Sequence, residues 1–110
     1  MWINDEDEYA ATVAVARTAS GTGRFVAVLE VAPTIFEFIR PNGVVYRLSV
    51  VRVLSTVPTA VNYGVVVDAT SSPAKRWRRT EYSGQGRSPS AALQNAISTI
   101  EVDQTPFGDD

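Results

Sequence analysis

Residues 35–54 read IFEFIRPNGVVYRLSVVRVL, a stretch that decides the fold because it is typical of one long β-hairpin. Its turn lies at 41–43 (Pro-Asn-Gly). Proline presets φ for the first corner of a type I turn, and glycine accepts the left-handed conformation that closes a three-residue loop. That loop fixes a register, which sets Phe36 opposite Leu48, Phe38 opposite Tyr46, Ile39 opposite Val45, and Glu37 opposite Arg47. Pairs of these kinds stabilise neighbouring strands, so we expect two antiparallel strands here.

Four further segments alternate along the chain in the manner of β-strands, with turn-forming residues between them. They are residues 9–18, 24–32, 61–69 and 75–83. The first of them is apolar or small on both faces, which is typical of a strand covered on both sides. If a five-residue loop joins the last two, Val67 lies opposite Trp77 and Asp68 opposite Arg76. In that register Trp77 points toward the core.

The clearest helix signal comes last. Ser88 is a good N-cap and Pro89 suits the first helical position, where its missing N–H costs nothing. Apolar residues then recur at the spacing of one helix face, at Leu93, Ala96, Ile97 and Ile100. We therefore predict an α+β fold: an antiparallel sheet of five or six strands built from consecutive hairpins, with one C-terminal helix packed on one face.

The amino-acid composition limits the kinds of chemistry that the chain can carry out. The chain has 110 residues with no histidine and no cysteine, which removes thiol and imidazole chemistry and zinc sites of the Cys/His kind. No loop spaces carboxylates for a hard cation. We therefore expect no enzyme activity, no metal and no cofactor. We divide the chain into a flexible acidic head at residues 1–8, a single domain at residues 9–101 and an acidic tail at residues 102–110. Without an export signal or membrane span, the protein is expected in the cytoplasm.

The strongest functional constellation is basic and aromatic. The segment Lys75-Arg76-Trp77-Arg78-Arg79 precedes Tyr82, and a glycine loop with Arg87 then opens the last helix. Arginines contact phosphates, an aromatic ring stacks on bases, and the N–H groups of a helix N-terminus bind anions. The candidate ligand-binding residues are Arg76, Arg78, Arg79, Tyr82 and Arg87. The partner they indicate is a nucleic acid or another phosphate-bearing ligand.

An alternative interpretation explains the same features. Charges on an edge strand also protect it against sheet-to-sheet aggregation. In that case the protein is an interaction or structural module, such as a small inhibitor or assembly subunit, that meets other proteins through its sheet surface and acidic ends. Both interpretations stay open at the level of sequence.

Two short stretches resemble parts of known families. Residues 84–88 with the alanine-rich helix after them resemble the strand-to-second-helix junction of double-stranded-RNA-binding domains. Residues 103–107 are similar to the acidic Asp-x-x-Pro-Phe tip of bacterial single-stranded-DNA-binding proteins. Both resemblances imply a role in nucleic-acid metabolism, and neither assigns the chain to a family.

The number of apolar sheet faces that must be covered predicts self-association. A sheet with two apolar faces requires two covers, and one helix at residues 89–101 shields only part of one face. The other face must close on itself or bury against a second copy. Two-fold dimers are the commonest homo-oligomers, so we expect a homodimer formed sheet to sheet or edge to edge.

Overall fold

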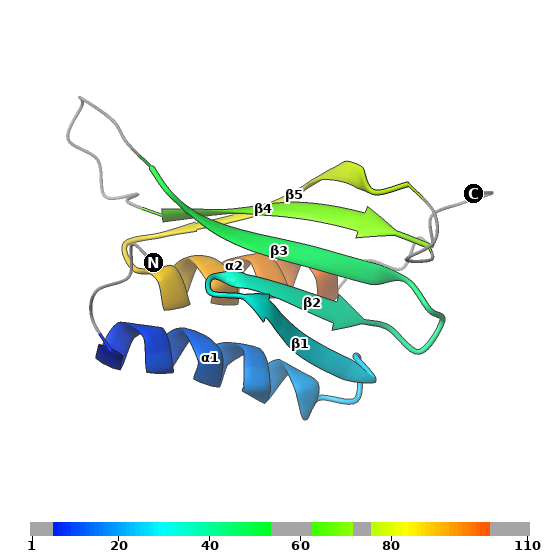
Figure 1. Cartoon of the computed structure of the whole chain (residues 1–110), viewed down its shortest axis with the longest axis horizontal. Helices are drawn as coiled ribbons and strands as arrows, with labels where there is room; N and C mark the ends of the chain where they lie inside the picture. Colours follow the sequence, from blue (N-terminus) through cyan, green and yellow to red (C-terminus); the bar gives the residue numbers. More distant parts are fainter. Residues whose placement is uncertain (1–5, 54–62, 72–75, 102–110) are drawn as a thin grey trace.

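The computed structural model describes residues 6–53, 63–71 and 76–101. They form α1 (Glu6–Ser20), β1 (Ala27–Ala32), β2 (Ile35–Ile39), β3 (Val45–Arg52), β4 (Tyr63–Thr70), β5 (Arg78–Gly86) and α2 (Pro89–Glu101). The five strands make one antiparallel sheet in chain order, from β1 to β5. Both helices lie on the same side of this sheet (Figure 1). The α+β prediction is confirmed, with a second helix that it did not include.

The β2–β3 hairpin has the register that its turn predicts. Phe38 pairs with Tyr46 and Glu37 with Arg47. Gly43 has a φ of 92°, so the turn uses the conformation that only glycine adopts without strain. The inner face, the one toward the helices, buries the alternate residues Phe36, Phe38, Tyr46, Leu48 and Val50. The turn chemistry therefore places the largest core side chains.

The strand predicted over residues 9–18 is wrong, because this segment belongs to helix α1. Its five alanines favour a helix, and the acidic residues 6–8 occupy the first turn, where they stabilise the helix dipole. Thr12, Ala16 and Ala19 are buried at helical spacing. Val13 and Val15 lie on different sides of this helix, and both are half-buried and pack against the core. Residues 6–8 thus form part of α1, and residues 1–5 lie outside the described chain.

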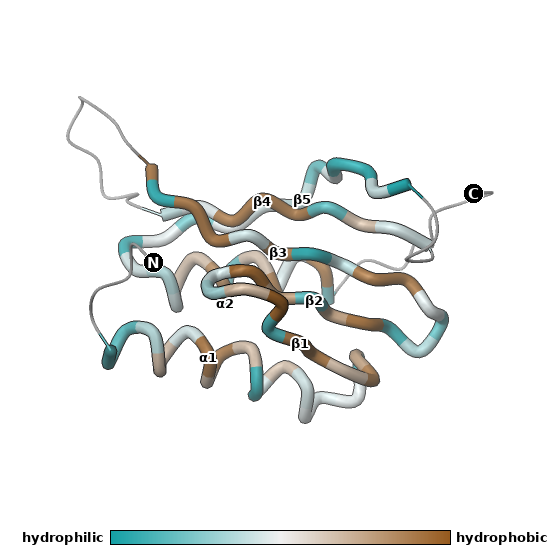
Figure 2. Tube along the Cα trace, in the orientation of Figure 1, coloured by the Kyte–Doolittle hydropathy of each residue, from teal (hydrophilic) through white to brown (hydrophobic). Residues whose placement is uncertain are grey.

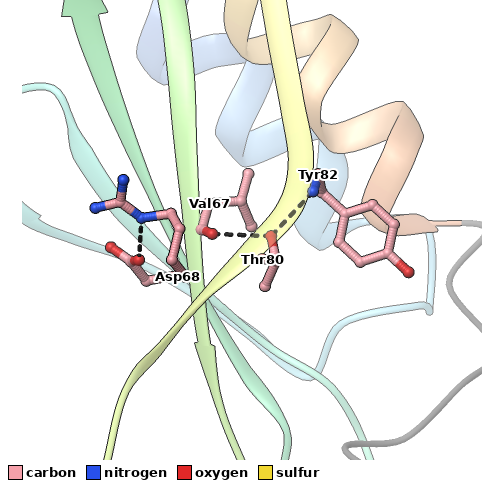
Figure 3. A network of polar contacts seen from close by, with 5 residues as sticks. Val67, Asp68, Thr80 and Tyr82 are labelled. Atoms are coloured by element: carbon pink, nitrogen blue, oxygen red, sulfur yellow. Dashed lines mark hydrogen bonds and ion pairs between the residues drawn. The ribbon is translucent and has the colours of Figure 1, made fainter.

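The predicted register of the last hairpin is also wrong. Asp68 pairs with Arg79 rather than Arg76, and a bulge follows, since Val66 pairs with Ser83. Val67 therefore lies opposite three residues of β5, and the Thr80 hydroxyl donates a hydrogen bond to its carbonyl at 2.8 Å. The backbone N–H of Tyr82 donates in turn to the Thr80 hydroxyl at 3.1 Å (Figure 3). One side chain thus provides hydrogen bonds for two backbone groups at the bulge.

Helix α2 begins as predicted, with the Ser88 hydroxyl accepting a hydrogen bond from the N–H of Ala91 at 3.2 Å. Its predicted apolar stripe is buried in the core. Close packing requires glycine on β5: a Cβ at Gly84 would lie 2.3 Å from the carbonyl oxygen of Ala92. At the other end, Arg24 and Arg40 donate hydrogen bonds to the last carbonyls of the helix. Positive charges at the C-terminal end of a helix also interact favourably with the helix dipole.

The other element boundaries can be compared with those predicted from the sequence. Strand β1 begins at Ala27, later than the predicted Arg24. Residue 54, the last of the predicted hairpin, falls outside the described residues, as does the acidic tail from residue 102. None of the described helices is long and apolar enough to cross a membrane.

Candidate functional site

The structure distributes the predicted ligand-binding residues along the whole of β5. Arg76, Arg78, Arg79 and Arg87 are exposed, whereas Tyr82 is half-buried. Eleven residue steps separate Arg76 from Arg87, which amounts to roughly 35 Å of extended strand. The predicted residues therefore do not converge on one small ligand. They form a line along one edge of the sheet.

Arg79 and Tyr82 have structural contacts that limit what they can bind. The Nε–H of Arg79 donates to Asp68 at 2.6 Å, and 67% of the Arg79 side chain stays exposed. Tyr82 packs against the core cluster beneath the sheet. In Figure 3 the ring of Tyr82 and the Asp68 ion pair lie on opposite sides of β5. The stacking platform predicted at Tyr82 thus has part of its ring committed to the core.

The N-terminus of α2 also holds an anion from this chain. The N–H of Ser90 donates to the carboxylate of Glu8 at 3.0 Å, so the first turn of α1 supplies the negative charge that this helix end favours. The glycines at 84 and 86 serve the close approach of α2, because a Cβ at either position would lie under 3 Å from helix atoms. The N-terminus of α2, which the sequence suggested as an anion-binding site, is therefore occupied by the contact between the two helices.

A row of alternating charges crosses the outer face of the sheet, the face turned away from both helices. We call it the charge ladder. It runs across four neighbouring strands in register and consists of Glu37, Arg47, Asp68 and Arg79. Two pairs in it are in direct contact: Arg47 with Glu37 at 2.7 Å and Arg79 with Asp68 at 2.6 Å. The ladder gives the outer face a fixed order of negative and positive groups.

Trp77 lies over this ladder and not in the core, contrary to the prediction. The guanidinium of Arg47 sits 4.0 Å from the centroid of the Trp77 ring. The ring is half-buried, and a cation–π contact of this kind holds both side chains in place. Trp77 changes face because the true register of β5 differs from the predicted one by an odd number of residues.

Beside the ladder lies a group of apolar side chains on the outer face, which we call the apolar patch. Three of its members are exposed: Leu29 by 47%, Val51 by 39% and Val53 by 39%. Ile35 and Val66 complete it and are half-buried. Figure 2 shows hydrophobic positions along β1 to β4, although no described helix covers the outer face. An apolar group of this kind marks a binding surface when it is contiguous.

A cavity of about 570 Å³ lies between α1 and the edge strand β1. Val13, Val28 and Phe36 contribute to its apolar wall. At one end, the Tyr9 hydroxyl donates to both carboxylate oxygens of Glu30, at 2.8 and 2.6 Å. This hydrogen bond raises the pKa of Tyr9 above its ordinary value. The contact ties α1 to β1 beside the cavity.

Sequence reasoning found one half of the ladder, the Glu37–Arg47 pair, and missed that Asp68 and Arg79 continue it. The missing information was the length of the connection between β4 and β5. The stretch at 103–107 lies outside the described residues. A comparison of the chain with protein-family models, curated proteins and solved structures finds no match.

Proposed function

We propose that this protein is a non-catalytic interaction module that binds another protein chain through the outer face of its sheet. The observation that carries the proposal is the apolar patch, which is exposed on a face that no described helix covers. Removing Leu29, Val51 and Val53 from water stabilises a complex by about 25 cal/mol per Å² buried. The ladder beside the patch supplies polar groups that order a partner.

Site-specific cross-linking tests this proposal. A photoreactive benzoylphenylalanine replaces Val51 on the outer face or, as a control, Gln94, which is exposed on α2. Both proteins are illuminated in extract of the cells that naturally produce the chain, and adducts are identified by mass spectrometry. We expect a defined protein adduct from position 51 and none from position 94. Equal labelling at both positions, or none at either, contradicts the proposal.

Nucleic-acid or phosphate binding is a second candidate function, supported by the exposure of Arg76, Arg78 and Arg87. Two or three phosphate contacts to a single strand correspond to a log–log salt slope of about −2. Fluorescence anisotropy with single-stranded and duplex DNA and RNA at low salt measures both affinity and slope. The double variant Arg76→Ala/Arg78→Ala is expected to flatten the slope. An unchanged slope, or no binding to any of these polymers, removes this candidate.

A further inference from the structure

We propose that the outer face binds a second copy of this chain, face to face, about a two-fold axis that runs parallel to the strands between β3 and β4. The inference rests on the function proposed above and names the partner of that surface. Its basis is the order of the charges in the ladder, together with the side chains on either side of it.

The ladder is self-complementary about this axis. Its signs alternate from β2 to β5 as negative, positive, negative, positive. The two-fold rotation reverses the order of the strands in the second copy. Glu37 then faces Arg79 of the second copy, and Arg47 faces Asp68 of the second copy. Four complementary pairs form across the interface, counting both halves.

Two other two-fold axes in the plane of the sheet bring like charges together. An axis along β3 sets Arg47 against its own copy and Glu37 against Asp68 of the second copy. An axis perpendicular to the strands, along the ladder, sets each charge against itself. Like charges facing each other across an interface are strongly unfavourable, which disfavours both arrangements. An axis between β2 and β3 pairs only Glu37 with Arg47 of the second copy, so the axis between β3 and β4 forms more complementary pairs.

The rows beside the ladder fit the same axis. Val51 is paired with Gly64 in the sheet, and Ser49 is paired with Val66. After the rotation, Val51 faces Gly64 of the second copy and Ser49 faces Val66 of the second copy. In each case a larger side chain meets a smaller one, as interdigitating sheets require.

The charged groups retain the capacity for a second contact. Arg79 binds Asp68 through Nε, which is one of five donors on a guanidinium, and its side chain is 67% exposed. Both hydrogen bonds from Arg47 end on Oε2 of Glu37. A carboxylate accepts several hydrogen bonds, so Glu37 and Asp68, whose side chains are 16% and 23% exposed, keep acceptor capacity. The Arg47 side chain is 37% exposed beside the Trp77 ring.

The outer face is large enough to form a specific interface with a second copy. Strands β2 to β5 have 5, 8, 8 and 9 residues. At about 3.3 Å per residue and about 4.8 Å between strands, they cover roughly 480 Å² of flat area. Two such faces together reach about 1,000 Å², the lower bound for a specific interface, before the projecting side chains are counted.

Charge reversal tests the arrangement on the full chain. Arg79→Glu and Glu37→Arg each set like charges against one another in a homodimer, so each variant alone is expected to dimerise about tenfold more weakly or worse. A mixture of the two restores opposite charges at both contacts and should form a heterodimer. Arg87→Glu is the matched control, because it makes the same charge change at an exposed position outside the ladder. Native mass spectrometry, with one variant labelled with nitrogen-15, separates the species.

A heterodimer favoured over both homodimers, with wild-type behaviour for Arg87→Glu, supports the inference. Random mixing, or equal effects of Arg79→Glu and Arg87→Glu, overturns it, as does a wild-type chain that stays monomeric. Circular dichroism confirms that each variant is folded. If Glu37→Arg is not, the comparison of Arg79→Glu with Arg87→Glu decides alone, since both residues are exposed. A cross-linked adduct of position 51 with a different protein would retain the proposed function and reject the second copy.

Discussion

The two faces of this sheet are made from the same strands but meet different surroundings. Val50 on the inner face is 3% exposed, whereas Val51, the next residue, points to the outer face and is 39% exposed. The inner face carries aromatic and aliphatic side chains under α1 and α2, and the outer face carries the charge ladder and the apolar patch. The inner face holds the fold together, and no described helix covers the outer face.

Substituting the two neighbouring valines gives the largest expected difference between the faces. Val50→Lys places a charge in the core and is expected to lower the free energy of unfolding by about 3 kcal/mol or more. Val51→Lys leaves its ammonium in water and should change it by less than about 0.5 kcal/mol. Urea denaturation at low protein concentration measures both. Similar losses for the two variants would mean that the outer face is as closed as the inner one.

Glycines on the two faces provide the next comparison. A Cβ at Gly84, beneath α2, would lie 2.3 Å from a backbone oxygen, whereas a Cβ at Gly64 meets atoms no closer than 3.7 Å. Gly84→Ala should therefore cost about 1–3 kcal/mol of unfolding free energy, because the helix must move away from β5. Gly64→Ala should cost much less. Thermal unfolding followed by circular dichroism measures the difference, and a tolerated Gly84→Ala would contradict the packing of α2.

A polar contact between the two helices, at the N-terminus of α2, is expected to make a smaller contribution to stability. Glu8→Ala removes the carboxylate that accepts from Ser90 and should lower stability by about 1 kcal/mol. Glu6 lies in the same first turn of α1 and is exposed, so Glu6→Ala is the control. Equal melting temperatures for the two variants would show that Glu8 does not hold the helices together.

The smallest expected effect is a pH dependence at the edge of the helix layer. The hydrogen bond to Glu30 raises the pKa of Tyr9, so the protonated phenol is favoured in the folded state. Its contribution to stability is present below the ordinary pKa of about 10 and is lost as the pH rises through the folded value. Wild-type protein should therefore lose more stability above pH 10 than Tyr9→Phe. Parallel stability curves for the two proteins would exclude this contribution.

The sequence predicts structure well where a few residues set the local geometry. The three-residue turn at 41–43 determines which side chains of β2 and β3 face one another. Ser88 and Pro89 determine where α2 begins, and its spacing of apolar residues identifies the buried side. These signals are local, so no knowledge of the rest of the fold is needed to interpret them.

The errors arise where two interpretations of a pattern are equally good or where the geometry depends on distant contacts. In α1, alternating small residues suit a strand or a helix, and the acidic first turn was the signal that favoured the helix. In β5, neither the length of the connection from β4 nor the bulge at Val67 can be inferred from turn residues. That shift moved Trp77 to the outer face and gave Asp68 a different arginine, which is why the ladder was only half predicted.

Sedimentation equilibrium of Val51→Lys, Val26→Lys and the wild-type chain most directly tests the claim that the outer face binds a second copy. Val26 is 65% exposed but precedes β1 and lies outside the patch, so it controls for the loss of an exposed valine. At micromolar concentration we predict about twice the chain mass of 11.9 kDa for the wild type and for Val26→Lys. Val51→Lys should sediment as a monomer. A single species near 11.9 kDa for all three proteins would contradict the account.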